Sequence, residues 1–151
     1  MKPLIVLIGV FCISAFIIKF ITKAYNLPLA ARIAMCVMLC FTAIGHVVLT
    51  KGLAMMTPDV IPFKIELIYM TGLLEVLLGI GLLIPSVRTY AAWMLIVFFI
   101  LILPSNIYAA IKHIDYEKAT FDGSGVGYLW FRVPLQLLFI VWVYVSSIKF
   151  N

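Results

Sequence analysis

The chain has 151 residues, of which 66% are hydrophobic and only 11% are charged, with a formal net charge of +5. So few charged residues cannot cover the surface of a water-soluble domain of this length, which excludes a soluble globular protein. The positive charge does not indicate nucleic acid, because the basic residues fall mainly between or at the ends of apolar runs, where anionic lipid headgroups are the expected neighbours. We therefore predict an integral membrane protein in contact with membrane lipids and with no nucleic acid partner.

Five apolar segments approach the roughly 20 residues that a helix needs to cross the hydrocarbon core of a bilayer. The first follows Lys2 and resembles a secretory signal, but it has no small-x-small cleavage site, so we interpret it as a retained anchor helix. The prediction is an all-α transmembrane bundle of five spans, in which residues 1–30 form the anchor and its loop and residues 31–151 form a four-helix domain. The predicted spans are 4–21, 31–49, 65–84, 89–111 and 127–148. Between them, residues 25–28, 51–64, 85–86 and 112–125 are predicted breaks, and the last is expected to be a solvated loop.

Basic residues are shared evenly between the two sides of this arrangement, so the positive-inside rule does not fix the orientation. The acidic residues other than Glu75 fall with the longer loops. We therefore expect the amino terminus and the two longer loops outside, and the carboxyl terminus in the cytoplasm. The expected location is a bacterial inner membrane.

Glu75 lies near the middle of the third span, where a carboxyl group costs at least about 2.5 kcal/mol. A chain that keeps such a group is expected to give it a partner or a task. Thr71, Gly72 and Gly79 stand three or four positions away and share its helical face, which makes a strip of small residues where a neighbouring helix can approach. Glu75 is therefore expected to face protein.

Other polar residues are predicted to collect in the outer half of the bundle. His46 is near the outer end of the second span, while Asn106 and Arg132 lie near the outer ends of the fourth and fifth spans. Gln136 follows Arg132 by four residues, so it shares that face one turn deeper, nearly level with Glu75. The Arg132 side chain is long enough to reach the Glu75 carboxylate and compensate its desolvation.

This cluster has a structural and a functional interpretation. Polar residues tie membrane helices together, with each hydrogen bond contributing about 0.6 to 2 kcal/mol. Alternatively, the cluster forms the polar end of an apolar cavity for a quinone, sterol or lipid, with Glu75 as a possible proton relay. A proton or ion path ranks third, because the inner half of the bundle offers little beyond Thr42 and Ser14.

Charged residues outside this cluster have simpler expected roles. Arg32 and Arg88 fall at cytoplasmic helix ends, where binding of lipid headgroups is the ordinary role. His113 and Asp115 lie in a loop, and two such ligands are too few to predict a metal site.

Several segments together resemble the DoxX-like family of small integral membrane proteins over residues 31–148. These are Arg32 opening a helix that ends in Gly45 and His46, and the stretches MMTPDVIPF, TGLLEVLLGIGLLIPSVR, LPSNIYAAI and LWFRVPLQLLFIVWVY. The resemblance implies a four-helix transmembrane core, to which the first span is an added anchor. Named members of that family include a subunit of a thiosulfate:quinone oxidoreductase, a membrane partner of oxidative-stress enzymes and animal relatives that assist receptor assembly.

The resemblance implies an accessory or redox-linked role without fixing a substrate. The chain departs from thiol-handling relatives, because it has no paired cysteines for disulfide exchange, and only His46 among its histidines lies in a span. The first hypothesis is an accessory protein, not an enzyme on its own, whose pocket binds a quinone or lipid or supports a partner. The alternatives are a membrane subunit of a quinone-linked oxidoreductase and a structural subunit of a larger membrane complex. The predicted ligand-binding residues are Glu75, His46, Asn106, Arg132 and Gln136.

Overall fold

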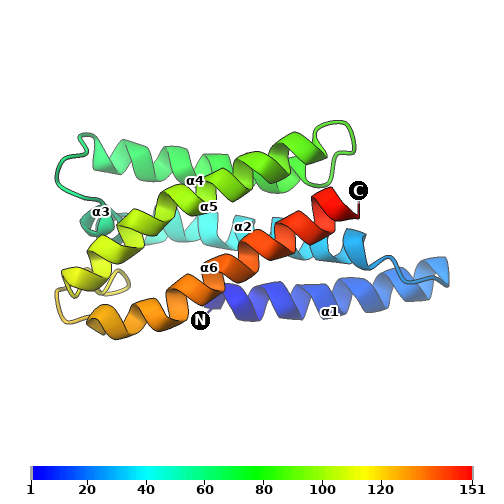
Figure 1. The fold of residues 1–151 in the computed structure, drawn as a ribbon, viewed down its shortest axis with the longest axis horizontal. Helices are drawn as coiled ribbons and strands as arrows, with labels where there is room; N and C mark the ends of the chain where they lie inside the picture. The colour runs from blue at the N-terminus through cyan, green and yellow to red at the C-terminus, as the bar shows by residue number, and fades with distance from the viewer. Residues whose placement is uncertain (1, 151) are drawn as a thin grey trace.

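The computed structural model describes residues 2–150, which form helices and no β-strand (Figure 1). Four helical stretches are long and apolar enough to cross a membrane: Lys2–Thr22, Leu27–Val48, Arg88–Ile111 and Gly125–Lys149. The all-helical class and the membrane-compatible character predicted from composition are thus confirmed. The helices are α1 (Lys2–Thr22), α2 (Leu27–Val48), α3 (Thr50–Met56), α4 (Lys64–Gly81), α5 (Arg88–Ile111) and α6 (Leu129–Tyr144), and a 3-10 turn (Gly125–Tyr128) and a π-helical turn (Val145–Lys149) flank α6.

Helix α2 and the segment that follows it differ from the prediction. Helix α2 begins four residues earlier than predicted, because the Asn26 side chain caps it by accepting a hydrogen bond from the Leu29 amide at 3.1 Å, with Pro28 in the first turn. Residues 51–56, predicted to be part of a break, lie in the short helix α3.

The long helices lie side by side along the longest axis of the molecule, with α2 near the centre (Figure 1). Helix α2 packs against α1 and α4, and α5 packs against α6. The core between them is apolar and includes Met35, Met38, Leu82, Leu95 and Val143. Large apolar side chains also cover the outward faces of the bundle, as expected for helices surrounded by lipid.

The connections fall at two opposite ends of the bundle (Figure 1). Helix α3 and the α5–α6 connection lie at one end, which we call the α3 end. The α1–α2 and α4–α5 connections and the carboxyl terminus lie at the other end. Helix α1 begins partway along the bundle, so that its first residues leave part of the α3 end uncovered.

The connection between α3 and α4 is fixed by charged groups. Asp59 accepts hydrogen bonds from Lys64 Nζ at 2.7 Å and from the Tyr108 hydroxyl at 3.0 Å, which ties the beginning of α4 to the last part of α5. These bonds from Lys64 and Tyr108 lower the pKa of the Asp59 carboxyl.

Candidate binding pocket

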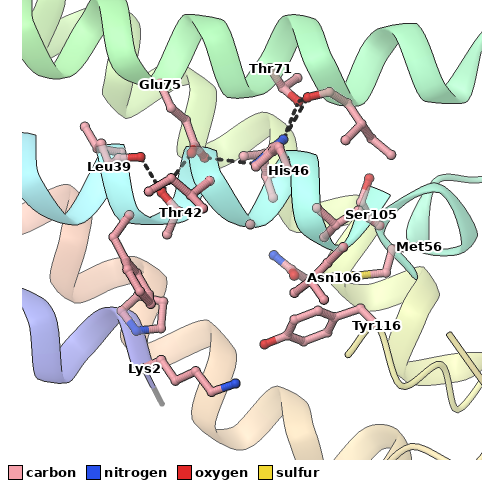
Figure 2. Close-up of a pocket in the computed structure, with 18 of the residues that line it drawn as sticks. Lys2, Leu39, Thr42, His46, Met56, Thr71, Glu75, Ser105, Asn106 and Tyr116 are labelled. Atoms are coloured by element: carbon pink, nitrogen blue, oxygen red, sulfur yellow. Dashed lines mark hydrogen bonds and ion pairs between the residues drawn. The ribbon is translucent and has the colours of Figure 1, made fainter. Parts of the chain in front are cut away.

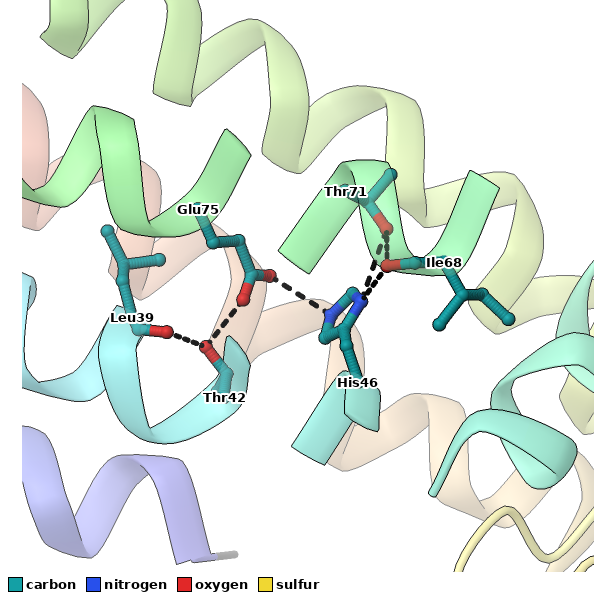
Figure 3. A network of polar contacts seen from close by, with 6 residues as sticks. All are labelled: Leu39, Thr42, His46, Ile68, Thr71 and Glu75. Atoms are coloured by element: carbon teal, nitrogen blue, oxygen red, sulfur yellow. Dashed lines mark hydrogen bonds and ion pairs between the residues drawn. The ribbon is translucent and has the colours of Figure 1, made fainter. Parts of the chain in front are cut away.

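Glu75 is 5% exposed and points from α4 toward α2 (Figure 3). The Thr42 hydroxyl lies 2.8 Å from Glu75 Oε2, and His46 Nε2 lies 3.6 Å from Glu75 Oε1. The carboxyl group therefore faces protein, as the small residues on its helical face predicted.

Glycines on α4 allow this close approach to α2. A Cβ atom at Gly72 would lie only 2.9 Å from His46 Cβ, and one at Gly79 would lie 3.4 Å from Cys36 Cα. A larger residue at position 72 would push the two helices apart at the level of the carboxyl group, so Gly72 is part of what positions His46 beside Glu75.

The contact of the other ring nitrogen of His46, Nδ1, shows that Nδ1 carries a hydrogen. His46 Nδ1 lies 2.8 Å from the Ile68 carbonyl oxygen, and this oxygen accepts only, so Nδ1 must carry a hydrogen (Figure 3). The Thr71 hydroxyl, 3.2 Å from Nδ1, donates to the same carbonyl and is a second acceptor for the Nδ1 hydrogen.

His46 Nε2 and Glu75 Oε1 face each other at 3.6 Å, which is an ion-pair contact when the imidazole is protonated. With Nδ1 directed at the Ile68 carbonyl, Nε2 is the ring nitrogen directed at the carboxyl group. His46 is therefore the basic side chain that partners Glu75 in the cavity wall.

Thr42 can form a hydrogen bond with the Glu75 carboxyl group whether or not that group carries a proton. Its hydroxyl lies 2.8 Å from Glu75 Oε2 and 2.9 Å from the Leu39 carbonyl oxygen, and its single hydrogen can be donated to either. It donates to Glu75 when the carboxyl group is ionised. The sequence did not lead us to place Thr42 in the site, although its position four residues before His46 puts both on one face of α2.

A second polar network joins α5 and α6. Asn106, which is 2% exposed, donates from Nδ2 to Gln136 Oε1 at 3.1 Å and accepts from Arg132 Nε at 3.2 Å. Gln136 Nε2 donates to the Phe99 carbonyl. This carbonyl is adjacent to the one that Pro104 deprives of its amide partner in α5.

The predicted contact between Arg132 and Glu75 is not formed. Thr42 and His46 already surround the carboxyl group from α2, and Asn106 offers Arg132 a nearer acceptor. The guanidinium group lies against the rings of Tyr116 and Tyr128 instead, with its central carbon 5.9 and 5.5 Å from the ring centroids.

A cavity of about 470 Å³ separates the two polar networks (Figure 2). Its volume is typical of sites that hold one small organic molecule. Most of the lining is apolar, and the five residues predicted from sequence to bind a ligand all line it. These are His46, Glu75, Asn106, Arg132 and Gln136.

The α5–α6 connection, which we predicted to be a solvated loop, contributes to the cavity wall. Tyr116 points inward beside Asn106 (Figure 2). Its backbone carbonyl lies where a Cβ atom of Gly52 in α3 would be, so only glycine fits at that position. At the rim, Lys2 Nζ and Glu117 Oε1 form an ion pair of 2.9 Å.

Apolar residues of α2 form another part of the rim. Ile44 and Val48 line the cavity and are 61% and 73% exposed. The cavity therefore opens toward the outward, apolar side of the bundle, next to the beginning of α1.

Arg32 and Arg88 lie at the end of the bundle opposite to α3. Arg32 is 6% exposed and its Nε donates to the Pro28 carbonyl at 3.0 Å, so its side chain packs inside the bundle and does not reach outward as predicted. Arg88 is partly exposed, and its Nε donates to the Leu82 carbonyl at 3.3 Å. Binding of lipid headgroups by these residues stays a prediction.

The chain belongs to the family described as "Domain of unknown function (DUF8561)". The family model matches residues 35–147, which extend from α2 into the π-helical turn after α6 and exclude α1. No curated protein and no solved structure matches the chain. The family description names no activity.

Proposed function

We propose that this chain is an accessory integral membrane protein that binds a lipophilic molecule, a quinone or a lipid, in the cavity between α2, α4, α5 and α6. The observation that carries the proposal is the cavity itself, because one apolar space of about 470 Å³ brings two buried polar networks to opposite walls. Structural hydrogen bonds alone need no such space. A polar head would contact the networks, and an apolar tail would contact the remaining lining.

The proposed membrane arrangement is a DoxX-like four-helix core with α1 as an anchor. A fifth crossing, by α4, is supported by the direction of the chain. Helices α2 and α5 both run toward the α3 end, so the chain must return between them, and α4 is the only long helix in that interval (Figure 1). Its 18 residues span about 27 Å, close to the thickness of the hydrocarbon core.

The position of the cavity supports uptake of a ligand from the bilayer. Its rim at Ile44 and Val48 faces the apolar surroundings of the bundle, so a lipophilic molecule need not pass through water. In the orientation proposed from the loop charges, this rim belongs to the outer half of a bacterial inner membrane, and the carboxyl terminus is cytoplasmic.

The pairing of His46 with Glu75 in the cavity wall favours a second candidate function, that of a membrane subunit in a quinone-linked oxidoreductase. A protonated Glu75 could donate its proton to a quinone oxygen when the quinone receives electrons from a partner subunit. Glu75→Gln would separate this candidate from simple binding, because the amide can still accept from Thr42 and donate to His46 but has no proton to give.

Filling the cavity tests the proposal. Gly45 lines the cavity and has no atom within 4 Å of the position of a Cβ, so the backbone accepts a side chain there and Gly45→Leu should reduce the cavity. We expect the amount of lipophilic molecule that copurifies with the protein, measured by mass spectrometry of organic extracts, to fall about tenfold or more. Gly9→Leu is the matched control, since Gly9 also has open space around it but lies on α1 outside the cavity lining.

Two outcomes would contradict the proposal. If no lipophilic molecule accompanies the wild-type protein, or if Gly45→Leu retains as much as Gly9→Leu, the polar networks only join helices and the proposal is wrong. Loss of quinone-dependent proton uptake in Glu75→Gln, with the ligand still bound, would favour the redox candidate.

A further inference from the structure

Most of the charged side chains that line the cavity lie beside a side chain of opposite charge. Lys2 and Glu117 form an ion pair at the rim and cancel each other. His46 and Glu75 face each other at 3.6 Å. Among the charged side chains of residues 2–150 that line the cavity, Arg132 is the one with no oppositely charged side chain in ion-pair contact.

The contacts of Arg132 orient it without neutralising it. Its Nε donates to the neutral Asn106 amide, and its guanidinium lies against the rings of Tyr116 and Tyr128. Such rings attract a cation but carry no net charge. Within residues 2–150 no carboxylate forms an ion pair with Arg132. Arg132 is partly buried, and an anionic group of a ligand in the cavity would supply the opposite charge that the chain does not place beside it.

We infer that the ligand of this cavity is an amphiphile with a single anionic head, a carboxylate or a phosphate, held by Arg132. This inference rests on the proposed function and specifies its ligand. The planar guanidinium group pairs well with either head, since two parallel hydrogen bonds to two oxygens fit both. A neutral quinone or sterol head would leave the charge of Arg132 unbalanced.

The rest of the cavity suits a hydrocarbon chain. Five buried apolar side chains line it: Met38, Leu39, Phe99, Leu135 and Phe139. The apolar rim at Ile44 and Val48 would let the chain enter from the bilayer while the head meets Arg132 near the α3 end. Figure 2 shows the cavity between Glu75 and His46 on one side and Asn106 and Tyr116 on the other.

Three probes with the same hydrocarbon chain test the inference on the full-length protein in a nonionic detergent. Oleate, oleyl phosphate and oleyl alcohol differ only in the head, and binding can be measured by native mass spectrometry at about pH 8, well above the ordinary carboxyl pKa of about 4. We expect one or both anions to bind at least about tenfold more tightly than the alcohol. Whichever anion binds more tightly distinguishes a fatty acid from a phosphate-bearing lipid as the source of the head.

Variants assign the preference to Arg132. Arg132→Gln should reduce binding of the anions to the level of the alcohol, whereas Arg132→Lys should keep most of the preference because it keeps the charge. Lys149→Gln removes a cation at the opposite end of the bundle and should change nothing. Circular dichroism would show whether Arg132→Gln folds. If it does not fold, the lysine variant and the comparison of the three heads in the wild type still test the preference for an anionic head.

The same binding measurements distinguish failure of the anionic head from failure of the proposed binding of a lipophilic molecule. If the alcohol binds as tightly as the anions, or if Arg132→Gln binds oleate like the wild type, the anionic head is wrong and a lipophilic ligand remains. If none of the three probes binds, the anionic head is wrong, and copurification of a lipophilic molecule with the wild-type protein decides the proposed function separately.

Discussion

Glu75 shows how one buried acid is made tolerable by a neighbouring helix. Both of its partners come from α2, where Thr42 and His46 are one helical turn apart and reach the two oxygens of the carboxyl group. The Ile68 carbonyl in turn holds the histidine ring from α4 itself. Because each polar atom has a partner, the carboxyl group is retained without an arginine beside it.

The hydroxyl of Thr42 should therefore contribute to stability. Thr42→Val keeps the shape of the side chain but leaves Glu75 Oε2 without its hydrogen bond, and we expect a loss of about 1 to 3 kcal/mol in the free energy of unfolding. Thr42→Ser keeps the hydroxyl and should lose clearly less. Unfolding titrations in detergent micelles would measure both, and equal losses in the two variants would show that the hydroxyl is not what matters.

Much of this site could be predicted from the sequence, because polar residues are rare in the spans. Their depth along each helix was enough to bring Glu75, His46, Asn106 and Gln136 around one cavity. Their pairing could not be predicted, since it depends on which faces of the helices meet. Arg132 was expected beside Glu75 and instead bonds to Asn106.

The long helices followed directly from the apolar runs, but the shorter segments did not. Helix α3 has only seven residues, too few for a periodic pattern to stand out. The inward position of Tyr116 depends on its backbone packing against Gly52, a contact between residues far apart in the sequence. Neither feature leaves a local signal in the chain, so both were missed.

The contact between α2 and α4 depends on one glycine more than on the other. Gly72→Ala would bring a Cβ atom to 2.9 Å from His46 Cβ, which can move only with its helix, so we expect a lower midpoint of thermal unfolding. Gly79→Ala meets its nearest atom at 3.4 Å and should be neutral or stabilising, since alanine favours a helix by up to about 1 kcal/mol over glycine. The midpoints of thermal unfolding of the two variants should therefore shift in different directions or by clearly different amounts. If Gly72→Ala is as stable as Gly79→Ala, the close approach at His46 is not required.

Helix α4, which carries Glu75 of the pocket, differs in composition from the other long helices of the bundle. Four helices are long and apolar enough to cross, and α4 joins opposite ends of two of them. Its three charged residues, Lys64, Glu66 and Glu75, set α4 apart from the other long helices, and Glu75 is the one that lies in the pocket. The helix least apolar in composition is thus the one that carries the acid of the site.

If α4 crosses the membrane as proposed, the loops on either side of it lie on opposite faces. In a variant without the native cysteines, single cysteines at Val60, Ser86 and Lys118 can be labelled in intact cells with a maleimide that does not cross membranes, and all three positions are exposed. We expect Val60→Cys and Lys118→Cys to react from outside, and Ser86→Cys to react only after the membrane is permeabilised. The opposite pattern would reverse the orientation while keeping the crossing. Reaction of Val60→Cys and Ser86→Cys from the same side would mean that α4 does not cross, and the cavity with Glu75 would then not lie within the bilayer.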